Sequence, residues 1–182
     1  MLVILMKPNT PVMKGYVPVE IPVKRYIKAY IESNLGLPIK LGRQSRSLII
    51  EKLHDYLEKK EPTKHSTSRE YPVTIKVYIT FAQYRNIGDT LSSTNIRNFN
   101  IFCETLIKEK YYNLMNDAWE VLPGFECHLP SIRKKLGIDI EAWSDDSMKK
   151  DYYRYRKRKG LRLLNRKERS HLKMSALHLP FL

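Results

Sequence analysis

Apolar and polar residues alternate most strictly along residues 73–81. A period of two is typical of a half-buried β-strand, so this segment is predicted to be one. Its apolar members are Val73, Ile75, Val77, Ile79 and Phe81. Residues 16–23 alternate in the same way, with Pro18 and Pro22 on the other side, and prolines on one side of a strand predict an edge strand or a docked arm. Residues 39–41 are predicted to form a very short strand.

Apolar residues at intervals of three and four predict amphipathic helices over about 23–33, 45–60 and 94–120. The expected inner face of the second helix consists of Leu48, Ile49, Leu53, Tyr56 and Leu57. The expected buried side of the third consists of Ile96, Phe99, Cys103, Leu106, Ile107, Leu114, Ala118 and Val121.

Two further helices are predicted in the last third of the chain. The first covers residues 129–136, with Pro130 in its first turn and Gly137 at its end. The second runs from about 145 to 159, behind a Ser-Asp-Asp start signal. The sequence therefore predicts a predominantly helical α+β fold, with a small N-terminal sheet packed against amphipathic helices and a C-terminal module that resembles a helix-turn-helix.

The chain divides by composition into four parts. We predict a flexible extension at 1–15, a mixed α/β domain at 16–122 with a polar loop at 61–71, a basic helical module at 125–160 and a tail at 161–182.

Positive charge is concentrated near the C-terminus. The chain has 33 Lys and Arg against 19 Asp and Glu, for a formal net charge of +14. Residues 132–182 hold 15 of these basic and 6 of these acidic residues. Such asymmetry favours a polyanionic partner at one end of the molecule, and nucleic acid is the commonest one.

The basic helix separates into two faces. Met148, Tyr152 and Tyr155 fall at helical spacing and are expected to pack inward. A basic ridge is expected on another face, formed by Lys150, Arg154, Lys157 and Arg158. Guanidinium groups on a rigid helix suit phosphates and guanine edges. The alternative interpretation is a solvated charged face.

The order helix, glycine-containing connection, basic helix is that of a helix-turn-helix, in which the second helix enters the major groove. The connection of about six residues is longer than the usual three or four. Base contacts are predicted from Lys149 and Lys150. Phosphate contacts are predicted from Arg133, Lys134, Lys135, Arg154, Arg156, Lys157, Arg158, Lys159 and Arg162.

Signatures of catalysis and of metal binding are weak. The sequence has no glycine-rich phosphate loop, no GxSxG or HExxH and no paired-cysteine motif. Asp145 and Asp146 could suggest a magnesium site. A favourable interaction of two carboxylates with the dipole at the start of a helix explains them better. A tyrosine nucleophile near Tyr152 is an alternative, although tyrosines in helices more often pack. We expect no catalytic residue, cofactor, metal or small-molecule substrate.

The segment IRKKLGIDIEAWSDDSMKKDYYRYRKRK, residues 132–159, resembles a type of small protein from Bacteroidetes phages and mobile elements. In that group a short helix, a Gly-Ile turn, an acidic cap and a Tyr/Arg-rich helix close a DNA-binding module. The resemblance implies a phage- or element-encoded regulator, replication accessory factor or virion component.

The sequence thus favours a non-enzymatic nucleic-acid-binding protein, with DNA as the partner, in the cytoplasm of a bacterial host. The main alternative is a phage structural or virion-assembly protein whose arms at 8–22 and 161–182 dock on neighbouring subunits, with homo-oligomers included. A strand-cleaving enzyme is a further alternative. A membrane partner is not expected, since the basic ridge has no Trp- or Leu-lined face opposite it.

Overall fold

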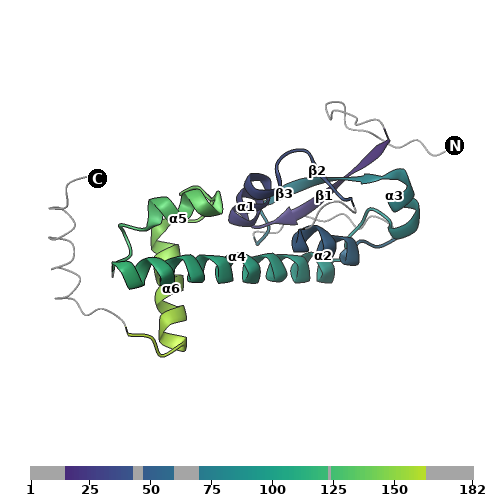
Figure 1. Cartoon of the computed structure of the whole chain (residues 1–182). Coiled ribbons are helices and arrows are strands. Elements are labelled where there is room, and N and C mark those ends of the chain that lie inside the picture. The colour runs from purple at the N-terminus through teal and green to yellow at the C-terminus, as the bar shows by residue number, and fades with distance from the viewer. Residues whose placement is uncertain (1–14, 43–46, 60–69, 123, 163–182) are drawn as a thin grey trace.

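The computed structural model describes residues 15–42, 47–59, 70–122 and 124–162 (Figure 1). Within these ranges the chain is α+β and predominantly helical, as the sequence predicts. The predicted extension at 1–15, the polar loop at 61–71 and the tail at 161–182 lie mostly or almost entirely outside the described residues. No helix in the described ranges has both the length and the apolar character needed to cross a membrane.

A three-stranded sheet forms one end of the molecule (Figure 1). The strands are β1 (Tyr16–Val23), β2 (Ile39–Lys40) and β3 (Val73–Thr80), in the order β1-β3-β2. β1 runs antiparallel to β3, and β2 runs parallel to it. All three predicted strands are confirmed, and β1 is at an edge, where its prolines interrupt no ladder.

Helices cover the apolar face of this sheet. α1 (Arg25–Leu35), α2 (Leu48–Tyr56) and the first half of α4 (Ser93–Val121) pack with the strands around one core. The predicted inner face of α2 is partly wrong, because Leu48 is 62% exposed and Ile50 is buried instead. The helix packs through Ile49, Ile50 and Leu53, and Leu48 lies outside that stripe.

A short helix, α3 (Phe81–Ile87), follows β3 directly and was not predicted. Its N-cap is Thr80, whose hydroxyl accepts a hydrogen bond from the Gln83 amide, while the Gln83 side chain accepts one from the Thr80 amide. This capping box ends the strand at Thr80. Phe81 is consequently 53% exposed, in contrast to its predicted place on the buried face of the strand.

α4 is 29 residues long and connects the sheet to the C-terminal helices (Figure 1). Its predicted buried side is confirmed at four positions: Ile96, Phe99, Cys103 and Ile107. It is wrong at Val121, which is 86% exposed. The second half of α4 instead buries large aromatic and sulfur-containing side chains, because two later helices contact it there. These residues are Tyr111, Tyr112, Met115 and Trp119.

The two later helices are α5 (Leu129–Leu136) and α6 (Asp145–Arg158), close to their predicted bounds. α6 crosses α4 near the C-terminal end of α4 (Figure 1). α5 ends at Gly137, which has a φ of 68° and closely approaches α1. The buried apolar residues of α5 and α6 belong to the same core cluster as those of the sheet.

Candidate nucleic-acid interface

Aromatic side chains fix α6 on α4, as the sequence predicts. Met148 and Tyr152 are fully buried. Tyr155 is half-buried and stacks on Tyr112 of α4, with ring centroids 4.0 Å apart. The Tyr152 ring meets Tyr111 edge-on at 6.1 Å. Stacked and edge-to-face rings each add about 0.5–1.5 kcal/mol beyond their burial, so α6 is a rigid platform.

The tyrosine hydroxyls are hydrogen-bond donors inside this interface. Tyr111 donates to the Met148 carbonyl at 2.9 Å, and Tyr112 donates to an Asp151 carboxylate oxygen at 2.6 Å. Tyr152 donates to the Asn116 side chain at 3.0 Å. Burial raises the pKa of all three hydroxyls. All three hydroxyls are engaged in hydrogen bonds within the contact of α4 with α6.

A chain of ion pairs also joins α4 to α6. Lys24 contacts Glu104 at 2.6 Å, Glu104 contacts Lys108 at 2.8 Å, and Lys108 contacts Asp151 of α6 at 3.1 Å. Burial alone would raise the pKa of Glu104, but the hydrogen bonds and charges of Lys108 and Lys24 lower it to about 2. The carboxylates next to α6 are thereby neutralised by internal cations.

The predicted basic ridge is exposed. Its four members are exposed, whereas Met148 and Tyr152 on the same helix are buried. They are Lys150, Arg154, Lys157 and Arg158, and we keep the name basic ridge for this set; Lys159 is exposed beside it. Within the described part of the chain, no ion pair joins any of these five to a carboxylate.

A groove of about 840 Å³ lies between α4 and α6, next to the basic ridge. Arg154, Lys157, Arg158 and Lys159 contribute to its wall on the α6 side. The positive charge of Arg158 acts on the Tyr112 hydroxyl of α4 and partly offsets the rise in pKa that burial causes there. The groove is lined by five cations against three carboxylates, and two of those carboxylates belong to the ion-pair chain.

Arg156 does not lie on the exposed surface, so its predicted role as a phosphate ligand is wrong. It is 8% exposed, with its guanidinium 4.5 Å from the Trp119 ring centroid. It donates to the Tyr152 hydroxyl at 3.0 Å and twice to the Arg162 carbonyl, at 3.1 and 2.7 Å. The spacing Met148, Tyr152, Arg156 already places it on the buried face, but its charge suggested the opposite.

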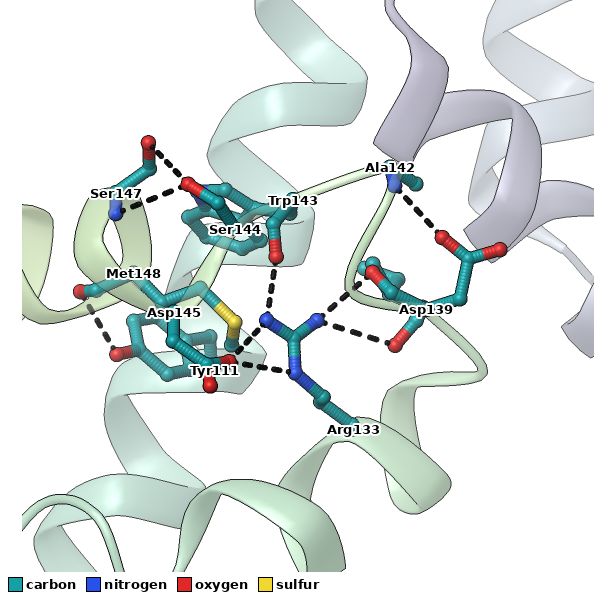
Figure 2. Close-up of polar contacts among 10 residues, drawn as sticks. Tyr111, Arg133, Asp139, Ala142, Trp143, Ser144, Asp145, Ser147 and Met148 are labelled. Carbon is teal, nitrogen blue, oxygen red and sulfur yellow. Dashed lines mark hydrogen bonds and ion pairs between the residues drawn. The ribbon is translucent and has the colours of Figure 1, made fainter.

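Arg133 is likewise engaged inside the molecule, in contrast to its predicted phosphate contact (Figure 2). Its guanidinium pairs with Asp145 and donates to the carbonyls of Asp139 and Trp143, at 2.8 and 2.5 Å. Only 13% of its side chain is exposed. Arg133 therefore stabilises the connection between α5 and α6. Its partners could not be identified from the sequence, because they depend on how that connection folds.

The start of α6 is held by caps and by a buried ring. Trp143 is buried and stacks on Tyr26 at 5.0 Å, consistent with a hydrophobic residue that fixes the first turn. Ser144 caps the helix by accepting from the Ser147 amide (Figure 2). Lys149, a predicted base contact, is paired with Glu126 at 2.5 Å. Lys150, the other one, is exposed.

The remaining predicted residues lie apart from the basic ridge. Lys134 and Lys135 are exposed on the last turn of α5. In the view of Figure 1 the C-terminal turns of α6 extend past α4 on the side away from α5. The structure therefore does not bring these lysines into one surface with the ridge. Arg162 is exposed, and its carbonyl is the acceptor for Arg156.

Possible metal ligands are dispersed. Within the described ranges, no three His, Cys, Asp or Glu side chains cluster in a way that could hold a metal ion. Cys103 is buried, and this burial raises the pKa of its thiol to about 12. Cys127 is exposed.

Comparisons of the chain with protein-family models, with curated proteins and with solved structures found no match.

Proposed function

We propose that this chain is a non-enzymatic nucleic-acid-binding protein, with DNA as the partner, and that the basic ridge of α6 is its contact surface. The observation that carries the proposal is a row of exposed cations without carboxylate partners in the described ranges, on a helix fixed by aromatic packing.

A charged face that serves only solubility usually mixes both signs. Here two of the three carboxylates that line the groove beside the ridge, Glu104 and Asp151, are engaged by Lys24 and Lys108. In the described ranges, no ion pair with a carboxylate offsets the charge of the ridge. Because α6 is already ordered by its contacts with α4, little further ordering of the backbone is required when the cations meet phosphates.

The test is a titration of the full chain with fluorescently labelled duplex DNA, single-stranded DNA and RNA at several salt concentrations. Four or five phosphate contacts give a slope of log K against log salt of about −4, which is a loss of about 250-fold in affinity between 50 and 200 mM salt. We expect the triple substitution Arg154→Ala, Lys157→Ala, Arg158→Ala to reduce the magnitude of that slope by about 3.

A matched control removes three exposed arginines elsewhere, by Arg25→Ala, Arg85→Ala and Arg97→Ala. This variant has the same net charge change, and we expect it to retain most of the affinity. Circular dichroism and thermal melts establish that both variants are folded. Equal loss in the two variants, or no binding of any nucleic acid by the unchanged chain, would contradict the proposal. Binding of the unchanged chain to anionic vesicles alone would point to a membrane surface instead.

The alternative of a virion-assembly protein relies on the two terminal arms. Residues 1–14 and 163–182 lie outside the described ranges, so this alternative stays a prediction.

A further inference from the structure

The two ends of α6 carry opposite charge. Asp145 and Asp146 occupy its exposed first turn, and Glu141 is exposed in the preceding connection. Glu126 lies next to the same end, paired with Lys149. The last two turns, in contrast, carry Arg154, Lys157 and Arg158.

The acidic N-terminal end of α6 is unsuited to contacting base edges in DNA. In a helix-turn-helix, N-terminal residues of the second helix contact base edges in the major groove. The phosphates that flank the groove would here meet Asp146, together with Asp145, which is paired with Arg133. Of the two lysines in the first turns, Lys149 is already engaged by Glu126 at 2.5 Å, and Lys150 is exposed as the first member of the basic ridge. Direct readout by the start of the helix would therefore rely on Lys150 alone among these lysines.

In the described ranges, the tyrosine rings beside the ridge are buried or half-buried, so they offer little free face to unpaired bases. Tyr152 is fully buried, and Tyr112 and Tyr155 stack on each other. Among the large hydrophobic side chains that are exposed in the described ranges, the aromatic one is Phe81, at the far end of the molecule in α3. Proteins that bind single strands obtain about 1–3 kcal/mol per base from stacking on exposed rings, whereas the fully exposed side chains of the ridge are cations.

The spacing of the ridge fits a regular row of phosphates. Lys150 to Arg158 is eight residues, which is about 12 Å along the helix axis. One strand of a duplex presents a phosphate about every 3.4 Å of its axis, so a length of about 12 Å corresponds to about four phosphates, in agreement with the four or five contacts expected above. A duplex holds those phosphates in fixed positions, and a rigid α6 matches a rigid row best.

We propose that α6 binds double-stranded nucleic acid without sequence preference, with the basic ridge along the phosphates of one strand and the acidic start of the helix turned away from the duplex. This inference rests on the proposed function and specifies its substrate class and its mode of binding.

The experiment uses the full chain with a pool of 20-base-pair DNA duplexes whose centre is randomised, through several rounds of selection and sequencing. We expect no enriched motif. In parallel, unlabelled single strands of the same length compete against a labelled duplex, and we expect them to be at least tenfold weaker competitors.

Two neighbouring substitutions test the geometry. Lys150→Ala should reduce the magnitude of the salt slope by about 0.9, because it removes one phosphate contact. Lys149→Ala should leave the slope unchanged, since this lysine faces Glu126. An enriched motif, stronger competition by single strands, or a larger effect of Lys149→Ala than of Lys150→Ala would overturn the inference while leaving nucleic-acid binding intact. The absence of binding to every probe would instead overturn the proposed function.

Discussion

Arg154 and Arg156 are two positions apart and have the same chemistry, yet their environments are opposite. Arg154 is exposed on the ridge, whereas Arg156 is enclosed by Trp119 and Tyr152 and bonded to the Arg162 carbonyl. Three of the five N–H donors of Arg156 are directed at acceptors, and hydrogen bonds from a charged group are stronger than neutral ones. Arg156 is therefore a structural residue that also fixes the chain just after α6.

We expect Arg156→Ala to lower the free energy of unfolding by about 2–4 kcal/mol, because it removes charge-assisted hydrogen bonds and leaves a cavity beside Trp119. Arg154→Ala should change it by less than about 0.5 kcal/mol. Urea denaturation followed by circular dichroism measures both. If the two substitutions had equal effects on stability, the burial of Arg156 would be wrong.

The burial of Arg156, but not that of Arg133, could have been predicted from the sequence. The i, i+4, i+8 relation of Met148, Tyr152 and Arg156 indicates a shared face, and giving periodicity more weight than charge would have predicted Arg156 correctly. Arg133 could not be predicted in this way. Two of its acceptors are carbonyls of the connection between α5 and α6, and no residue pattern encodes where those carbonyls point.

At the scale of elements, the contact of α4 with α6 depends on the ion-pair chain as well as on aromatic rings. The lowered pKa of Glu104, about 2, means that the folded state binds a proton less readily than the unfolded chain. The stabilisation from this carboxylate is therefore complete above about pH 4.5 and is lost as the pH falls toward 2.

We expect Glu104→Gln to lower the free energy of unfolding by about 1–2 kcal/mol at pH 6, after allowance for solvent screening, and by much less at pH 2.5. Urea denaturation at both pH values tests this. Glu109→Gln, on the exposed surface of the same helix, is the control and should have little effect at either pH. Parallel pH dependence of the Glu104 variant and the unchanged chain would contradict the assignment.

The boundaries of α5 and α6 were predictable because local signals fix them. Pro130, Gly137 and the cap at Ser144 each act within a few residues. The buried face of α4 was only half predictable. Its second half contacts α5 and α6, and their approach selects Tyr111 and Trp119 rather than the aliphatic residues that continue the first stripe.

The close approach of α5 to α1 gives a second test at this scale. A Cβ at Gly137 would lie 2.0 Å from the Ser33 hydroxyl oxygen, and its φ of 68° disfavours side chains. We expect Gly137→Ala to destabilise the fold by about 2–4 kcal/mol. Gly160→Ala, with a similar φ and open space around it, should cost only about 1 kcal/mol. Thermal melts of both variants distinguish steric clash from backbone strain.

At the scale of the whole molecule, the sheet and the basic ridge occupy opposite ends (Figure 1). The excess of basic residues in the C-terminal part of the sequence predicted a positively charged end of the molecule. The prediction applies because this basic segment folds into one end of the structure. The sequence alone could not predict which cations remain available. Folding engages Arg133, Lys149 and Arg156 and leaves the ridge, so the effective charge of the interface is smaller than the basic residues of α6 suggest.

The length of α4 has a mechanical consequence. Its 29 residues span about 44 Å without a break, and both the sheet and α6 are packed on it. If α6 rotates relative to a bound DNA duplex, the sheet therefore rotates through the same angle, because α4 connects the two. A fluorophore on the exposed α3 would report, by its polarisation on stretched DNA fibres, whether α6 binds a duplex in the orientation that we propose.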